Sequence, residues 1–183
     1  PHSNLKQVLP LKEATSEKHK IAERKPFNVR MFRGLLSKEE YALYLNQQLQ
    51  IFQVLESKGL PHNSLIRTEK VLADLDELRA EGHASDFILS STTNYVDYLD
   101  SLSYEQALPH IYLNYMAIMF GGQMIRKSVP STGRMYDFDN TQEAIQSIRS
   151  VQQDEWADEV NKGFDFNISI FEELEAECLS RQV

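Results

Sequence analysis

His19 and the adjacent pair Gly121 and Gly122 are the residues of this chain whose types and spacing suggest chemistry. Histidine is a common metal ligand and the usual proximal ligand of haem iron, and its second ring nitrogen normally donates to a fixed acceptor. Glu23 follows His19 by four residues, so on a helix the two side chains share one face. The residues alone also allow the alternative that His19 is a surface or satisfied core side chain.

The two glycines lie in a segment that otherwise favours a helix. Each costs about 1 kcal/mol relative to alanine inside a helix, so the pair requires a compensating use. One use is a bend, and a second is an approach of the backbone to a flat ligand with no side chain between them. The third is tight packing against another helix, and the sequence leaves all three open.

Composition predicts one ordinary globular domain spanning residues 1–183. The chain is 42% apolar and 25% charged, and it is long enough to bury a core. No apolar run approaches the ~18 residues that span a bilayer, so we expect no membrane segment. Pro1–Asn4 show no export signal, and Cys178 is the only cysteine, which excludes an intramolecular disulfide. A cytoplasmic location is the default expectation.

The net charge of −8 is accompanied by no cluster of basic and aromatic residues, so we expect no nucleic-acid partner. Basic side chains are nevertheless concentrated near the N-terminus, where they form either a local basic patch or a solvated helix face. They are Lys12, Lys18, Lys20, Arg24, Lys25, Arg30 and Arg33.

Nearly every segment has the 3.6-residue period of a helix, and none alternates as a strand does. The fold class is therefore all-α, with seven or eight helices. Ser37 and Glu40 form a capping box, and Gly163 marks an expected bend. The expected helices span residues 9–24, 27–33, 37–59, 68–80, 91–102, 103–127 (interrupted by the glycine pair), 142–161 and 164–179.

Three segments together resemble the haem oxygenases. The first, Leu11–Glu23, contains His19; the second, His110–Gln123, carries His-x-Tyr-x-x-Tyr before the glycine pair; the third, Phe164–Leu174, carries Phe-x-x-Asn-x-x-x-Phe-Glu-Glu-Leu. They have the order and spacing of the family, and the similarity spans most of the chain.

The resemblance implies a haem held between a proximal helix with His19 as its iron ligand and a kinked distal helix with Gly121 and Gly122. Glu23 matches the glutamate one turn after the ligand. Residues that match the family's propionate contacts are Lys12, Tyr112 and Arg149, whereas Ser16 replaces a second lysine. Residues that match its pocket are Phe164, Asn167 and Phe171. For the two phenylalanines, an ordinary place in the core is an equal alternative.

The reaction implied by the resemblance is the oxidative cleavage of haem by O2 to biliverdin, carbon monoxide and ferrous iron. Electrons come from an external donor such as ferredoxin or another reductase. Many members carry an aspartate in the distal helix that orders water, but this chain has Ile118 there. The position of the family's nearby arginine holds Asn114 in this chain. Either another polar group organises water at the haem, for which Asn114 is a candidate, or the oxygen chemistry is impaired or altered.

Three hypotheses follow from the sequence. The first is an active haem oxygenase with a different proton relay, and the second is a haem-binding protein that stores, senses or carries haem with weak degradation. The third is a relative of the same all-α fold that handles another ligand, such as a thiamine fragment or a di-iron centre. The absence of Glu-x-x-His from the sequence does not favour di-iron chemistry.

Overall fold

The computed structural model describes residues 8–182, so the expectation about Pro1–Asn4 lies outside the described residues. Within that range the fold is all-α, as predicted, with ten α-helices rather than seven or eight. They are α1 (Leu11–Ala14), α2 (Ser16–Glu23), α3 (Pro26–Phe32), α4 (Lys38–Lys58), α5 (Thr68–Ala80), α6 (Ser90–Asp100), α7 (Tyr104–Phe120), α8 (Gly122–Arg126), α9 (Thr141–Arg149) and α10 (Ala157–Arg181). Three short 3-10 helices are η1 (Asn63–Leu65), η2 (Arg134–Tyr136) and η3 (Asp154–Trp156).

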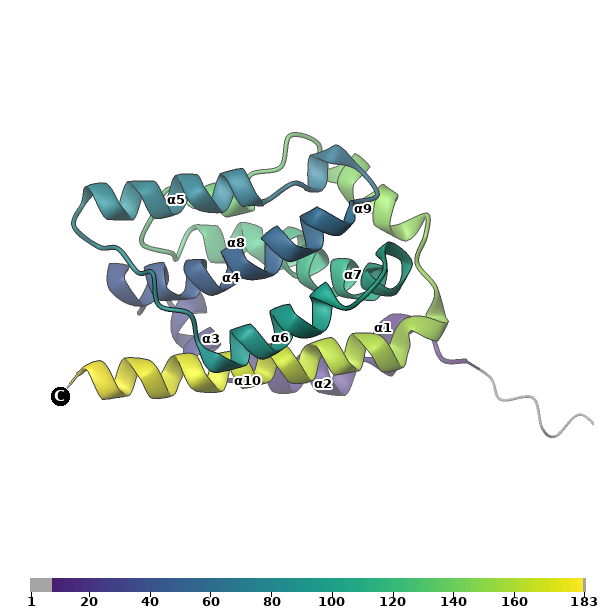
Figure 1. Cartoon of the computed structure of the whole chain (residues 1–183), viewed down its shortest axis with the longest axis horizontal. Coiled ribbons are helices and arrows are strands. Elements are labelled where there is room, and N and C mark those ends of the chain that lie inside the picture. Colours follow the sequence, from purple (N-terminus) through teal and green to yellow (C-terminus); the bar gives the residue numbers. More distant parts are fainter. Residues whose placement is uncertain (1–7, 183) are drawn as a thin grey trace, which may run out of the picture.

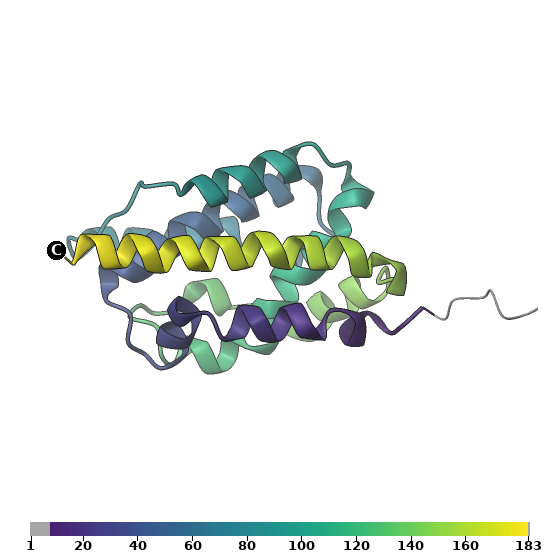
Figure 2. The ribbon, with the colours of Figure 1, turned by 90° about the horizontal axis from the view of Figure 1, so that it is seen from below.

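Helices α4 and α10 organise the bundle (Figure 1). Helix α4 packs against α5, α6 and α7, whereas α10 crosses α2, α3, α6 and α7. Figure 2 shows α10 running along the molecule with α2 beside it. The proximal and distal helices expected from the sequence therefore both pack against α10.

Two clusters of buried apolar side chains hold the helices together. The large cluster is built around α4, which buries residues on most of its circumference. The smaller cluster joins α1, α2, α7, α10 and η3, and we call it the second cluster. Its buried members are Leu11, Ala22, Leu113, Trp156, Val160 and Phe164. The second cluster fixes where the N-terminal helices lie against α7 and α10.

Local signals in the sequence are confirmed at several helix ends. The Ser37 hydroxyl accepts from the Glu40 backbone N–H at 3.1 Å, and the Glu40 carboxylate accepts from the Ser37 N–H at 2.9 Å. Gly59 follows α4 with a φ of 109°, a left-handed value that favours glycine. The expected interruption of the 103–127 helix occurs at Gly121, between α7 and α8.

Three expected helices have different bounds. The 9–24 helix is divided at Thr15, the 164–179 helix begins earlier, at Ala157, and the 142–161 helix ends at Arg149. The chain turns there because Trp156 packs into the second cluster and Asp154 Oδ1 accepts from the Leu11 N–H at 3.0 Å. The expected bend at Gly163 was wrong, because α10 continues through it.

The missing side chain at Gly163 instead permits close packing of α10 against α7. A Cβ there would lie 2.6 Å from Leu113 Cδ2 and 3.0 Å from His110 Nδ1. None of the helices in residues 8–182 is long and apolar enough to cross a membrane.

Candidate functional site

His19 lies on α2 with its side chain 55% exposed. Its Nε2 is 3.0 Å from Glu23 Oε1, so the i, i+4 contact expected from the sequence is present. The Glu23 carboxylate pairs with Nε2 of the ring, and Nδ1 is the other ring nitrogen. This is the arrangement of an imidazole that is oriented through one nitrogen and can bind a metal through the other.

Phe164 of α10 lies between His19 of α2 and helix α7. The two rings are stacked, with centroids 5.7 Å apart. Phe164 is itself buried in the second cluster with Ala22 of α2 and Leu113 of α7. Leu113 precedes Ala117 by one helical turn. His19 of α2 and Leu113 of α7 therefore both contact one buried ring of α10.

The two glycines have different surroundings. A Cβ on Gly122 would lie 2.5 Å from Cδ1 of Tyr136, so packing against Tyr136 requires glycine there. A Cβ on Gly121 would meet nothing closer than Ala117 O, at 3.4 Å. Tight packing thus accounts for Gly122, whereas the face of Gly121 is open. The sequence could not distinguish these two uses.

Gly121 belongs to an apolar face that the sequence reasoning did not single out. Ala117, Phe120, Gly121 and Met124 follow each other at the i, i+3, i+4, i+7 spacing of one helix face. Phe120 is 58% exposed and Met124 is 65% exposed. We call these four residues the open face. Contiguous apolar patches on a surface mark interaction or ligand sites, so the open face is a candidate for one.

Arg149 lies beside Phe120 of the open face, and Tyr112 lies within the electrostatic influence of Arg149. The guanidinium carbon of Arg149 is 5.6 Å from the centroid of the Phe120 ring. Burial raises the pKa of Tyr112, and the nearby charge of Arg149 partly offsets that rise. Tyr112 also packs edge-on against Trp156. Lys12 is exposed and follows Leu11, which is buried in the same second cluster.

Asn167 and Phe171 have different environments on α10. Asn167 Nδ2 donates to Asn114 Oδ1 at 3.3 Å. Phe171 stacks against Tyr44 and Phe27, each at 6.4 Å between centroids, and packs against the large cluster. Both phenylalanines therefore pack against buried cores, and Phe164 also contacts His19, the predicted ligand.

Ile118 does not lie on the open face, although it is adjacent to Ala117. Its side chain is 6% exposed and belongs to the large cluster. Asn114 is also buried, and its amide is bonded to Tyr95, His110 and Asn167. Ile118, at the position of the family's aspartate, therefore packs in the large cluster, whereas Asn114 is part of a polar network.

A family model with the description "Heme oxygenase" matches residues 6–173. The chain belongs to the heme oxygenase family. Heme oxygenase 2 of Rattus norvegicus is 27% identical over 90% of this chain, and that of Oryctolagus cuniculus is 26% identical over 90%. The chain spans 64% of the rat protein and 65% of the rabbit protein, so it covers less than two thirds of these curated relatives.

Solved structures of heme oxygenases share this fold. The heme complex of heme oxygenase-1 from Synechocystis sp. PCC6803 has a TM-score of 0.79 and 21% identity, with 93% of each chain covered. Heme oxygenase from Leptospira interrogans has a TM-score of 0.73 and 23% identity, with coverage of 89% of this chain and 97% of its own. At these identities the similarity establishes the fold, and the family match establishes membership.

Proposed function

We propose that this chain is a haem oxygenase that binds haem between α2 and the open face. The products of the proposed reaction are biliverdin, carbon monoxide and ferrous iron, formed with O2 and with electrons from ferredoxin or another external donor. The observation that carries the proposal is the open face. It presents large apolar side chains and a side-chain-free Gly121, and it is connected through Phe164 to an imidazole that a carboxylate already orients.

His19 is the proposed iron ligand, and Glu23 is its positioning residue. A hydrogen bond to one ring nitrogen fixes the rotation of the imidazole and makes the other nitrogen a stronger donor to a metal. In the structure Nε2 holds that bond, so ligation uses Nδ1 or follows a rotation of the ring that exchanges the two nitrogens. Haem, when bound, supplies the iron that binds and activates O2.

The open face covers the other side of the proposed site. Phe120 and Met124 are apolar and exclude water from a ligand laid against them, whereas Gly121 allows the backbone to come close. Gly122 contributes indirectly, because it lets α8 pack on Tyr136 and so sets the position of its neighbour. These two glycines are the proposed distal residues together with Asn114.

Lys12, Arg149 and Tyr112 are the proposed partners of the haem propionates. Lys12 and Arg149 are exposed cations, and Tyr112 lies within the electrostatic influence of Arg149. Charge-assisted hydrogen bonds to carboxylates are the stronger kind. Ser16, which stands where the family has a second propionate lysine, is half-buried and uncharged. Lys12, Arg149 and Tyr112 therefore anchor the propionates without it. Phe164 and Asn167 complete the proposed pocket on α10, with Phe171 supporting it from the large cluster.

A haem titration tests the proposal. The protein is expected to bind one haem with a sharp Soret band and, with ascorbate or ferredoxin and its reductase, to replace that band with biliverdin absorbance. A Soret band that persists under reducing turnover would favour the haem storage or sensing alternative. Failure to bind haem would overturn both.

The variant His19→Ala tests the ligand. Removal of the imidazole is expected to abolish the histidine-ligated spectrum and to weaken haem binding by more than the roughly 10–100-fold that loss of a supporting contact costs. The matched control is His83→Ala, since His83 is also partly exposed and faces a carboxylate, Glu39, at 3.7 Å. An unchanged spectrum in His19→Ala would remove His19 from the ligand role.

A further inference from the structure

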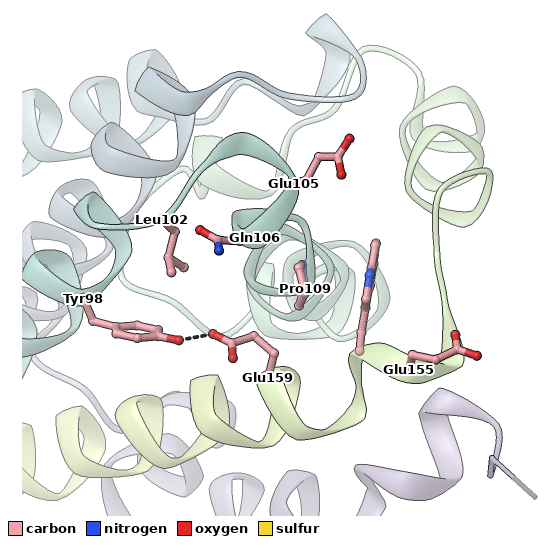
Figure 3. A pocket seen from close by; sticks show the side chains of 8 residues that line it. Tyr98, Leu102, Glu105, Gln106, Pro109, Glu155 and Glu159 are labelled. Carbon is pink, nitrogen blue, oxygen red and sulfur yellow. Dashed lines mark hydrogen bonds between the residues drawn. The ribbon is translucent and has the colours of Figure 1, made fainter.

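A pocket of about 300 Å³ lies where α6, α7, η3 and α10 meet, and we call it the Trp156 pocket (Figure 3). None of the residues that line it belongs to the open face or to the proposed haem partners. Its volume is about ten times the share of one water molecule in the liquid, so it has room for a short organic chain. The Trp156 pocket is therefore a second candidate for ligand binding.

Aromatic and apolar side chains form one part of its wall. They are Tyr98, Leu102, Pro109 and Trp156. Pro109 is buried in α7, and Trp156 is only 9% exposed and packs edge-on against Tyr112. This wall is held by the core, so it offers a ligand an apolar surface of fixed shape.

Glu159 supplies a carboxylate whose direction is fixed. Its Oε1 lies 2.9 Å from His110 Nε2 and also accepts a hydrogen bond from the Tyr98 hydroxyl, as Figure 3 shows. Burial opposes ionisation of Glu159, but the bonds from Tyr98 and His110 outweigh it and lower the pKa of the carboxyl. The side chain is 33% exposed, and within residues 8–182 its Oε2 has no hydrogen-bond donor. Glu159 is thus a charged acceptor with one oxygen left for a ligand.

The charge of the Trp156 pocket is negative. Glu105 and Glu155, both exposed, line it together with Glu159, and no basic side chain lines it. Lys162 lies beside it, with Nζ 4.1 Å from the centroid of the Tyr98 ring. An ammonium group of the chain itself therefore already occupies one face of an aromatic wall residue, which is the contact that organic cations make with aromatic rings.

The placement of the carboxylates favours an extended cation over a metal ion. No group of three His, Cys, Asp or Glu side chains in the described part of the chain is arranged to hold a metal ion. The carboxylates are instead spread along a wall that also carries Trp156 and Leu102. An aliphatic diamine matches this pattern, because its methylene groups can cover the apolar wall while its terminal ammonium groups face carboxylates.

We propose that the Trp156 pocket binds a small organic cation of the aliphatic diamine class, with Glu159 as the acceptor of one ammonium group and Trp156 as the contact of the carbon chain. The site is separate from the proposed haem site and does not rest on the proposed function.

Fluorescence tests the proposal directly, because Trp156 is the only tryptophan of the chain. Diaminopentane added to the full chain without haem, at constant ionic strength, should change the Trp156 emission and reach saturation. Glutarate, a dicarboxylate with the same number of carbon atoms, and magnesium chloride should leave the emission unchanged. A titration with no saturable change overturns the proposal.

Two other results would assign the pocket to a different occupant and so overturn the proposal. An equal response to magnesium chloride would indicate a metal ion. Tighter binding of a tetralysine peptide than of diaminopentane would indicate the basic segment of a protein partner.

Glu159→Gln tests the acceptor. It keeps the size of the side chain but removes its charge, so it should weaken diaminopentane binding by roughly tenfold to a hundredfold, the range for a hydrogen bond to a charged group. The matched control is Asp158→Asn, which removes the same charge from the preceding, exposed position outside the pocket and should change the affinity by less than about twofold. Equal weakening in both variants would reflect net charge alone and would overturn the site.

Glu155→Gln provides a test that does not disturb the bonds of His110. Glu155 is exposed on η3, so its replacement should leave the fold intact and weaken diaminopentane binding by roughly twofold to fivefold, as expected for an exposed charge. An unchanged affinity in both Glu155→Gln and Glu159→Gln would overturn the proposal.

Discussion

The two sides of the α7–α8 segment differ in what fills the space beside them. On one side His110, Asn114, Ile118 and Gly122 are buried, and the polar groups are bonded while the glycine contacts Tyr136. On the other side the open face, with Phe120 and Gly121, has solvent beside it. Adjacent residues in the sequence thus belong to different environments.

This difference separates stability from ligand binding. Residues of the buried side are constrained by the fold, because a change in size or charge there meets protein atoms on every side. Apolar side chains of the open face contribute little to folding, and their burial is gained when a ligand covers them. Substitutions on the buried side should therefore lower the unfolding free energy, whereas substitutions on the open face should mainly weaken ligand binding.

Ile118→Asp has the largest expected effect. A carboxylate without a partner in the large cluster should cost roughly 3–5 kcal/mol of unfolding free energy at neutral pH. Burial raises the pKa of the introduced carboxyl in the folded state, so the loss grows as pH rises above about 3.9 and shrinks when the group is protonated. Denaturant unfolding at acidic and neutral pH measures both.

Ala117→Asp is the matched control, because it introduces the same carboxylate at the neighbouring exposed position. Its unfolding free energy should stay within about 1 kcal/mol of wild type. A similar loss in both variants would mean that the two sides of α7 do not differ as described.

Gly122→Ala should cost about 1–3 kcal/mol, because the added methyl group would overlap the Tyr136 ring. Thermal and denaturant unfolding measure this cost. If the ring is the cause, a double variant with Tyr136→Ala should lose less than the sum of the two single variants. Strict additivity would contradict the assigned contact.

His110 should make stability depend on pH. Burial lowers its folded-state pKa below the ordinary value of 6.5, so on acidification the unfolded chain binds the proton first. Its contribution is constant above about pH 6.5 and falls below it, by up to about 1.4 kcal/mol per pH unit, until the folded state also protonates. Unfolding free energies of wild type and of His110→Gln, measured as a function of pH, isolate the contribution of His110. If the two proteins show the same pH dependence, the assigned contribution is contradicted.

Gly121→Ala should have the smallest effect on folding. Alanine favours a helix by up to about 1 kcal/mol, and the nearest atom to its Cβ is a carbonyl oxygen of the same segment at 3.4 Å. Stability should be unchanged or slightly higher, while haem binding weakens because a methyl group now occupies the open face. Unfolding and haem titration of one preparation measure both, and a loss of stability equal to that of Gly122→Ala would disprove the distinction between the glycines.

Much of the fold could be predicted because its signals are local. The capping box of Ser37 and Glu40, the left-handed Gly59 and the interruption at Gly121 each act within a few residues. The contact of His19 with Glu23 is equally local, since it needs only the helical repeat. The helix ends at Arg149 and Ala157 were missed because they depend on distant partners, Leu11 and the second cluster.

The candidate site was predictable only in part for the same reason. The sequence by itself determined the helices, the His19–Glu23 pair and the family resemblance, because these reside in short-range spacing. Only the tertiary structure decided which glycine packs and which stays open, that Ile118 is buried, and that Glu159 of α10 reaches His110 of α7. Those relations join residues on different helices, and their distances are set by helix packing, which no single segment encodes.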